Sequence, residues 1–441
     1  MKSKSIRTAV VTVTAATLLL AATACSSASS GGGGTPGSSA PSAVTLKFAY
    51  MGTTDQQAQW NQLFAQFEQS YPNIQVQAEA INVNDWGAFS DKLSTQIAGG
   101  DIPDVIQIAT EGQMRFAASG LLEPLDSYIS QDKSTIDEYY SDIDPKLLTF
   151  IQQHGSPDGQ TYYLPGDFNT MVMWCNTDVV SQAGATLPAA GQGWTWDQFD
   201  QFAKTIHDNT SAYAFNAADN GYFTGVLPWV LTAGGNVMDS TWTQATFNSQ
   251  PVIDAATFVQ GLVSQGYSPA PGGTFDEFAM AAQDKLACYG GGRWPIIQTR
   301  TNNMVSKTQL VPWPSENGKQ GSPIGWNSYP ILKASQNKDA AWDFVKFMIS
   351  KAGSSYFASL GGTIVPARQS VAQSQDFLGN SPVGTDELYK AVSYATPLPA
   401  PSQEANIAAA VQDGWAQIVS GNVSPSDGAA QVQAKMESIL Q

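Results

Sequence analysis

The chain has 441 residues, only 13% of them charged, and a formal net charge of −16. This length is more than one hydrophobic core usually organises, so two or more lobes are expected. Charged residues ordinarily make up about a quarter of a globular chain, so neutral polar side chains must cover much of this surface. The acidic balance argues against a nucleic acid or an anionic membrane surface as the partner.

The first residues predict an export leader. A short basic region, Lys2 to Arg7, precedes an uncharged apolar run over 9–22, which is too short to span a bilayer. Residues 1–24 are therefore predicted to be a secretory signal peptide. Without the three cations of this leader the chain keeps 18 positive and 37 negative side chains, a net charge of −19.

Small residues lead to Cys25 and resemble a bacterial lipoprotein box, in which the cysteine becomes the lipidated first residue. Ala22 stands where Leu is usual, and the alternative is a simple secreted protein without the modification. Residues 25–43 are thus predicted to be a lipidated Cys25 followed by a flexible tether, because the residues after Cys25 are rich in Gly, Ser and Pro. The expected location is the outer face of the bacterial cell membrane, where the membrane is contacted through the lipid anchor only.

Strands and helices alternate over the next segment. Residues 44–50, 74–78 and 104–108 read as strands, and the segments between them carry apolar side chains at helical spacing. Asp55 is the expected cap of the first helix, and Asn84 or Asp85 that of the second. This order predicts an α/β fold with a parallel sheet and crossover helices. Ligands of such sheets bind beyond the carboxyl ends of the strands, here the loops 51–56 and 109–113.

The stretch Thr161 to Asp178 predicts a junction between lobes. It reads as two extended runs separated by a Leu-Pro-Gly-Asp loop that contains Asp167. Further elements are predicted from periodicity and turn residues: helices at 194–206 (Thr195 as cap), 226–231, 251–265, 338–350, 405–419 and 425–440, and strands at 213–216 and 286–289. The last strand runs into three glycines followed by Arg293 and Trp294, which indicates a close backbone approach.

The sequence contains no convincing catalytic motif. An S-x-x-K match at Ser335 to Lys338 lacks its companion motif and sits at a natural helix start, and His154 and His207 lie in polar stretches. No cofactor or metal motif is present. Acid-base chemistry would fall to a carboxylate pair such as Glu111 and Asp167. The sequence therefore favours a binding protein over an enzyme.

Two cysteines remain after the leader, Cys175 and Cys288. An even number of cysteines in the mature part of an exported protein is compatible with a disulfide, and the alternative is two buried thiols. The sequence alone leaves both open.

The order of short motifs resembles family 1 of the extracellular solute-binding proteins, the carbohydrate-capturing subunits of ABC importers. The motifs are FAQFE (64–68), YPNI (71–74), AGGD (98–101), PDV (103–105), SGLL (119–122), YLP with Asp167 (163–167), NTD (176–178), WTWD (194–197), AGG (233–235) and AAWDF (340–344). The chain departs from the family at 290–294, where GGGRW replaces an Asp-Gly-Pro-Trp pattern and only Trp294 matches. The two cysteines stand at strand positions that are aromatic or aliphatic in the family, which favours their pairing.

The resemblance implies a two-lobed periplasmic-binding-protein fold, with the ligand between the lobes and crossing strands as the hinge. The expected lobes are 44–168 with 324–376, and 169–323 with 377–441. The residues implied or inferred to bind the ligand are Glu111, Asp167, Tyr222, Trp294, Trp326, Asn327, Asp55, Tyr50, Trp229 and Arg368. Each has a structural alternative: Trp229 and Trp326 as core, the carboxylates as helix caps or turns, and Arg368 as the partner of a surface carboxylate.

The expected function is capture of a mono- or oligosaccharide and its delivery to the membrane permease by a monomer that catalyses nothing. Sugar rings stack on aromatic side chains, and their hydroxyls bind carboxylates, amides and Arg. The alternatives are another polar solute, such as a glycerol phosphate ester, and a secreted carbohydrate-active enzyme that uses Glu111 and Asp167.

Overall fold

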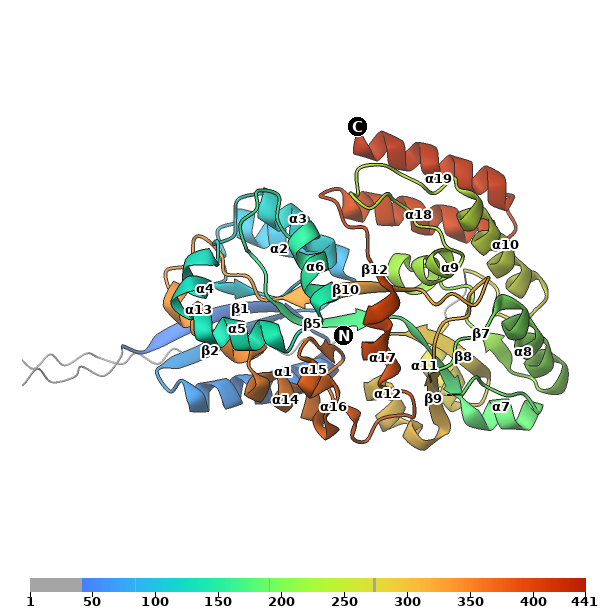
Figure 1. Ribbon diagram of the computed structural model, residues 1–441, viewed down its shortest axis with the longest axis horizontal. Coiled ribbons are helices and arrows are strands. Elements are labelled where there is room, and N and C mark those ends of the chain that lie inside the picture. The colour runs from blue at the N-terminus through green and yellow to red at the C-terminus, as the bar shows by residue number, and fades with distance from the viewer. Residues whose placement is uncertain (1–41, 84, 190, 273–274) are drawn as a thin grey trace, which may run out of the picture. The chain divides into compact units, whose positions relative to one another are not determined.

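The computed structural model describes residues 42–441 apart from 84, 190, 273 and 274 (Figure 1). The predicted signal peptide, the lipidated Cys25, almost all of the tether and the alternative cap Asn84 lie outside these residues, as does the side chain of Asp55. Among the helices of the described part, none is both long enough and apolar enough to cross a membrane.

The first sheet confirms the predicted alternation of strands and helices. Its strands are β1 (Val44–Met51), β2 (Ile74–Ile81) and β3 (Val105–Ile106), in the order β2-β1-β3 with parallel pairing. The crossover helices are α1 (Thr54–Ser70) and α2 (Trp86–Ala98). The buried stripe of α2 is the expected one of Phe89, Leu93 and Ile97.

The structure confirms the predicted N-cap of α2 but not that of α1. Asp85 caps α2, where its side chain accepts from the Ala88 N–H at 2.7 Å, as predicted. The prediction that Asp55 caps the first helix is wrong, because α1 begins at Thr54 and its N-cap is Thr53. The Thr53 N–H donates to Oε1 of Gln56 at 3.0 Å, which gives the backbone N–H of the N-cap residue a partner.

The third predicted strand is divided between two sheets. β3 pairs with β1, whereas β4 (Ile108–Ala109) pairs antiparallel with β10 (Ser322–Ser328) in the second sheet. The chain therefore passes from the first sheet to the second just before Glu111.

The second sheet is made of segments far apart in sequence. It has the order β11-β5-β10-β12, with β4 also on β10, and contains β5 (Pro165–Thr170), β11 (Val365–Pro366) and β12 (Ala395–Pro397). The prediction of a loop over Pro165 to Asp167 is wrong, because these residues start β5. Proline is tolerated at a first strand position, and a Cβ on Gly166 would lie 2.3 Å from the Tyr329 ring.

The third sheet has the order β7-β8-β6-β9. Its strands are β7 (Tyr213–Phe215), β8 (Leu286–Gly291), β6 (Val172–Asn176) and β9 (Thr308–Val311). Cys175 and Cys288 are opposite each other on β6 and β8 and form a disulfide with an S–S distance of 2.15 Å.

The residues that the structure describes form two hydrophobic cores. One surrounds the first sheet, and the other surrounds Phe199, Trp229 and Trp415 beside the third sheet. Successive β6 side chains alternate between them, with Trp174 in the first core and Met173 in the second. β5 and β10 run between the two sets of helices, as Figure 1 shows.

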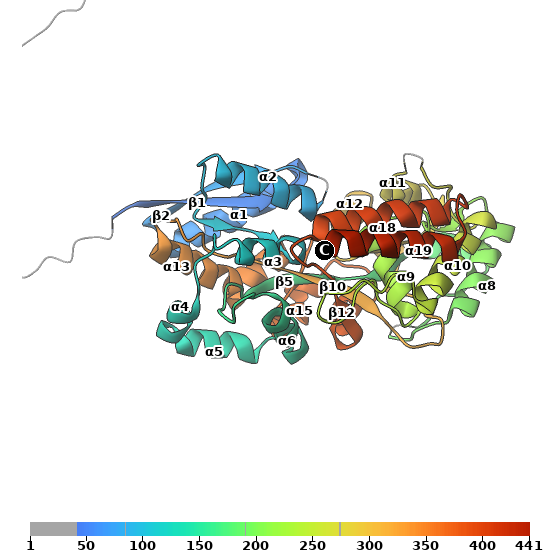
Figure 2. The same cartoon turned by 90° about the horizontal axis from the view of Figure 1, so that it is seen from above.

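The remaining helices cover these sheets. Beside the first core lie α3 (Thr110–Ala118), α4 (Asp126–Gln131), α5 (Lys133–Ser141), α6 (Pro145–His154), α13 (Lys338–Ile349), α14 (Lys351–Ser359), α15 (Gln369–Ala372) and α16 (Gln375–Leu378). The other helical elements are α7 (Thr177–Ala183), α8 (Trp196–Asn209), a π-helical turn (Tyr222–Val226), α9 (Leu227–Thr232), α10 (Gln250–Ser264), α11 (Glu277–Ala282), α12 (Ile296–Thr301), α17 (Glu387–Lys390), α18 (Glu404–Val419) and α19 (Pro425–Leu440). Of these, α11, α12 and α17 contribute Ala281, Ile296 and Leu388 to the first core. Figure 2 shows α18 and α19 side by side. The predicted Thr195 cap of α8 and both C-terminal helices are confirmed.

Candidate functional site

A cavity of about 770 Å³ opens beside the carboxyl end of β7 and the end of β8. This volume is in the range of small-molecule sites. Its lining residues come from the chain between 216 and 294: Asn216, Ala218, Asp219, Asn220, Thr224, Pro269, Ala270, Gly272, Phe275, Asp276, Glu277, Phe278, Gly290 and Trp294. Aromatic rings and carboxylate or amide groups therefore face one space.

Trp294 is held in place by the glycines that precede it. A Cβ on Gly292 would lie 2.6 Å from Oδ1 of Asn169, so only glycine fits between this loop and β5. The same Asn169 oxygen accepts from the Arg293 N–H at 2.8 Å. Trp294 remains partly exposed, and the Phe223 ring lies 6.4 Å from it, centroid to centroid. The loop that bears Trp294 is thus fixed against a strand that runs between the two cores.

The polar wall of the cavity is acidic. Asn216 Nδ2 donates to Oε2 of Glu277 at 3.0 Å, and the Gly221 N–H donates to Oδ1 of Asp219 at 2.8 Å. Burial, together with the charge of Asp219, raises the pKa of Glu277 to about 8, although the bond from Asn216 opposes the shift. Burial also raises the pKa of Asp219. No Lys or Arg is among the described residues that line the cavity.

Glu111 lies in the first turn of α3, next to the crossing strands. Thr110 Oγ1 accepts from the Trp326 N–H of β10 at 2.8 Å, which ties the start of α3 to that strand. The Glu111 side chain is partly exposed, and its pKa is raised to about 7 by burial and by the charge of Asp85. Glu404, at the start of α18, is 4% exposed, and the charge of Glu111 helps to raise its pKa. The carboxyl groups of Glu111 on α3 and Glu404 on α18 are therefore close enough for their charges to interact.

Asp167, Trp326 and Asn327 meet in the second sheet but are buried there. Asp167 is 2% exposed, and its oxygens accept from Asn327 Nδ2 at 2.5 Å and from the Tyr329 hydroxyl at 2.8 Å. Burial raises the pKa of Asp167 to about 7. Trp326 donates from Nε1 to Gln113 at 2.8 Å. Asp167 is therefore buried among side chains of its own sheet and is not among the residues that line the cavity.

The remaining candidates lie apart from the cavity. Tyr50 stacks on Phe48 inside the first core, and Trp229 packs in the second core against Trp313. Tyr222 is buried, and its hydroxyl donates to the Pro399 carbonyl at 3.1 Å.

Arg368 takes the ion-pairing role that the sequence left open. It is 3% exposed and pairs with Glu138 at 2.7 Å and with Asp142 at 3.1 Å. Burial lowers its pKa, but the bonds to these two carboxylates outweigh burial and leave the pKa raised.

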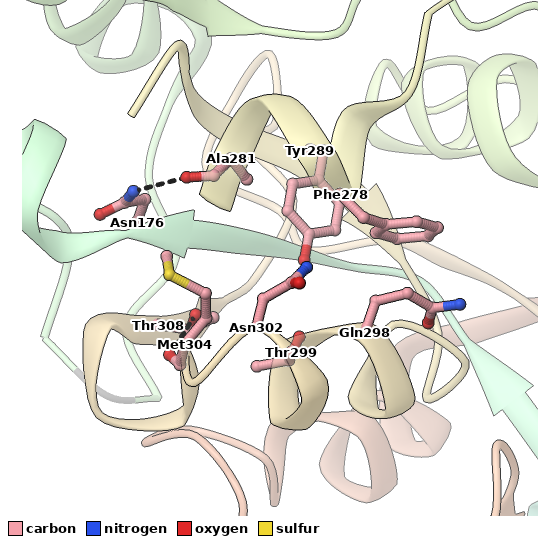
Figure 3. A pocket seen from close by; sticks show the side chains of 9 residues that line it. All are labelled: Asn176, Phe278, Ala281, Tyr289, Gln298, Thr299, Asn302, Met304 and Thr308. Atoms are coloured by element: carbon pink, nitrogen blue, oxygen red, sulfur yellow. Dashed lines mark hydrogen bonds between the residues drawn. The ribbon is translucent and has the colours of Figure 1, made fainter. Parts of the chain in front are cut away.

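Two smaller cavities do not suit a sugar. The one drawn in Figure 3, between β8, α11 and α12, has a volume of about 10 Å³, room for one water molecule. It is lined by polar groups such as Asn176, which donates to the Ala281 carbonyl at 2.9 Å. A second, of about 20 Å³, lies beside Asp167 and Tyr329.

Sequence reasoning missed most of the cavity lining. Asp219 and Asn220 follow β7 in a polar, turn-prone run, so the rule that ligands bind beyond strand ends would have found them if it had been applied there. Phe223 adjoins the predicted Tyr222. Glu277 starts a short helix behind its cap Asp276 and carries no signal of its own. Within the described residues, no group of three or more His, Cys, Asp or Glu side chains is placed to hold a metal ion.

The chain is similar in sequence to known bacterial proteins. The chain is 27% identical over 334 residues to an uncharacterized lipoprotein of Streptomyces antibioticus, covering 71% of this chain and 69% of the relative. It is 24% identical over 373 residues to the diacetylchitobiose binding protein DasA of Streptomyces coelicolor, covering 82% of each.

The fold is similar to solved structures. The ABC substrate-binding protein Lmo0181 of Listeria monocytogenes, solved in complex with cycloalternan, has a TM-score of 0.77 at 21% identity and covers 90% of this chain and 98% of its own. The family model described as bacterial extracellular solute-binding protein matches residues 52–354, more than half of the chain. The chain therefore belongs to the bacterial extracellular solute-binding proteins, which bind their solutes without catalysing a reaction.

Proposed function

We propose that this protein is the extracytoplasmic sugar-binding component of an ABC importer and that the 770 Å³ cavity holds part of the sugar. The observation that carries the proposal is that the partly exposed Trp294 lines that cavity together with carboxylate and amide groups. A sugar ring has an apolar face that packs on an indole and an edge of hydroxyls that needs fixed acceptors and donors. The names of relatives that bind diacetylchitobiose and lactose support a saccharide.

In this proposal, a residue beside the first core completes the sugar-binding site. Glu111 is the proposed contact from that side, because it follows β4, remains partly exposed and lies beside the crossing strands. The proposed lobes are 44–168 with 324–376, and 169–323 with 377–441. The crossing segments β5, β10 and β12 would then act as the hinge of a closing motion.

The proposed setting is the outer face of the cell membrane. A lipid on Cys25 would anchor the chain, and a lipoprotein among its relatives supports that modification. The proposed partner is the permease of the importer, to which a monomer delivers the sugar. Electrospray mass spectrometry of the mature protein tests the anchor, because diacylation at Cys25 adds a lipid mass that a Cys25→Ser variant lacks.

Calorimetric titration of the full chain with a panel of mono- and oligosaccharides tests the function. At least one saccharide is expected to bind saturably without being hydrolysed. Trp294→Ala should weaken that binding by about 10- to 100-fold, because a buried aromatic anchor dominates such interfaces.

Tyr213→Ala is the matched control, since Tyr213 is an exposed aromatic residue of β7 that does not line the cavity. Equal affinities of the Trp294→Ala and Tyr213→Ala variants would refute the role of Trp294. Release of reducing sugar during the titration would refute the binding function.

A further inference from the structure

We propose that the cavity takes a sugar that bears a protonated amine, and that Asp219 and Glu277 bind its ammonium group. This inference rests on the proposed sugar-binding function and narrows its ligand class. The two carboxylates come from different elements, one from the loop after β7 and the other from the first turn of α11, and both line the same cavity.

The hydrogen bonds of these carboxylates leave room for a ligand. Glu277 accepts one side-chain bond at Oε2, from Asn216, and its Oε1 has no partner among the residues that the structure describes. Asp219 accepts from the Gly221 N–H and from Thr224. Asn216 is itself partly exposed at the cavity wall. A donor in the cavity can therefore reach an unused acceptor of Glu277.

The charges of the cavity wall are not balanced by the protein. Asp219, Asp276 and Glu277 line the cavity together, and no ion pair in the described part of the chain involves any of the three. Burial, and then the charges of Asp219 and Asp276, raise the pKa of Glu277, so ionising Glu277 in this cavity has an electrostatic cost. A ligand that supplies a positive charge relieves this cost, whereas a uronic acid or a phosphorylated sugar increases it.

The apolar part of the site fits the same ligand. Trp294 and Phe278 contribute aromatic side chains to the cavity lining, on which a pyranose can pack, and the carboxylates line the same space. An ammonium group bound by ionised carboxylates forms charge-assisted hydrogen bonds, which are stronger than the bond a hydroxyl makes at the same position. The cavity is thus expected to prefer an amine to a hydroxyl or an acetamide.

Proton release provides a readout that a purely structural role of Glu277 would not move. With a pKa of about 8, Glu277 is largely protonated in the free protein at pH 7. An ammonium group favours the ionised form, so binding of the amine should release a proton. A neutral sugar should release almost none. Titrations in two buffers of different ionisation enthalpy measure this difference.

Within each set, the experiment uses sugars that differ only in the group at C2, which is an ammonium, an acetamide or a hydroxyl. The β-1,4-linked set is the free-amine glucosamine disaccharide, N,N′-diacetylchitobiose and cellobiose, and the α-1,4-linked set is 2-amino-2-deoxymaltose and maltose. In at least one set the amine should bind tenfold or more tightly than its neutral counterpart, with proton release. Glu277→Gln should reduce this preference at least fivefold. Glu437→Gln, an exposed change on α19, should leave it unaltered.

The outcomes separate this inference from the proposed function. Saturable binding of neutral sugars with no preference for the amine, or a preference that survives Glu277→Gln, overturns the ammonium site while the sugar-binding function stands. Failure of every saccharide to bind overturns the function itself. If Glu277→Gln does not fold, as judged by circular dichroism, Asp219→Asn takes its place with the same criterion.

Discussion

Replacing Asp167 by Asn should stabilise the folded protein above neutral pH. Asp167 is 2% exposed between Asn327 and Tyr329, and burial raises its pKa to about 7, from 3.8. An asparagine of the same shape can accept from Asn327 and donate to the Tyr329 hydroxyl, so the buried groups stay paired without a charge.

The sign follows from proton binding. The folded pKa is above the unfolded one, so the folded state holds the Asp167 proton between about pH 4 and pH 7 while the unfolded state has lost it. The stability from this group is complete below pH 4 and is lost as the pH rises through 7. A shift of about three units corresponds to at most about 4 kcal/mol, and an effect of about 2–4 kcal/mol is expected.

Urea unfolding at pH 4.5, 6 and 8, followed by far-ultraviolet circular dichroism, measures this effect. At pH 4.5 the variant and the wild type should have similar free energies of unfolding, and at pH 8 the variant should be more stable by about 2–4 kcal/mol. Asp413→Asn, a change at an exposed carboxylate of α18, is the control and should shift neither value. Parallel stability curves for Asp167→Asn and the wild type would refute the assignment of a protonated Asp167.

Three further changes test other parts of the structure. The His154 ring stacks on Trp242 with 3.8 Å between centroids, and burial lowers the pKa of His154 to about 4. The free energy of unfolding of the wild type should therefore fall by about 1–3 kcal/mol as the pH falls from about 6.5 to 4, whereas that of His154→Phe should not. Melting temperatures of both proteins at pH 7 and pH 4.5 measure this difference. Replacing both Cys175 and Cys288 by Ala should lower the free energy of unfolding by about 2–5 kcal/mol, and an unchanged urea midpoint would show that the disulfide adds no stability. Gly292→Ala places a methyl group 2.6 Å from Asn169 Oδ1 and should displace Trp294. The affinity for sugar measured by calorimetry should then fall about tenfold, and an unaltered affinity would contradict this prediction.

Much of the fold was predictable because it depends on local patterns. The spacing of Phe89, Leu93 and Ile97 identified α2, and the alternation of strands and helices identified the parallel sheet. The division between β3 and β4 was not predictable, because it depends on β10, which follows some 200 residues later. Pairing with β10 and β11 likewise turned the expected Pro-Gly-Asp loop into the start of β5.

The site was harder to predict than the fold, because burial decides which polar residues a ligand can reach. Trp294 was identified from the glycines before it, and the structure places it in the cavity. Trp229, Tyr50 and Arg368 have the side-chain types of a sugar site, but the structure places them in cores or in an ion pair. Asp219 and Glu277 lie 58 positions apart and meet only because α11 packs beside the end of β7.

The first core also bears on the order in which this chain folds. Phe48 of β1 packs against Phe344 of α13 with 5.0 Å between ring centroids, so this core closes only after a partner from the distant part of the chain has been made. Contacts so far apart in sequence form slowly, because a long loop must close first. The first core is therefore expected to form late in folding, after the residues of α13 have joined β1.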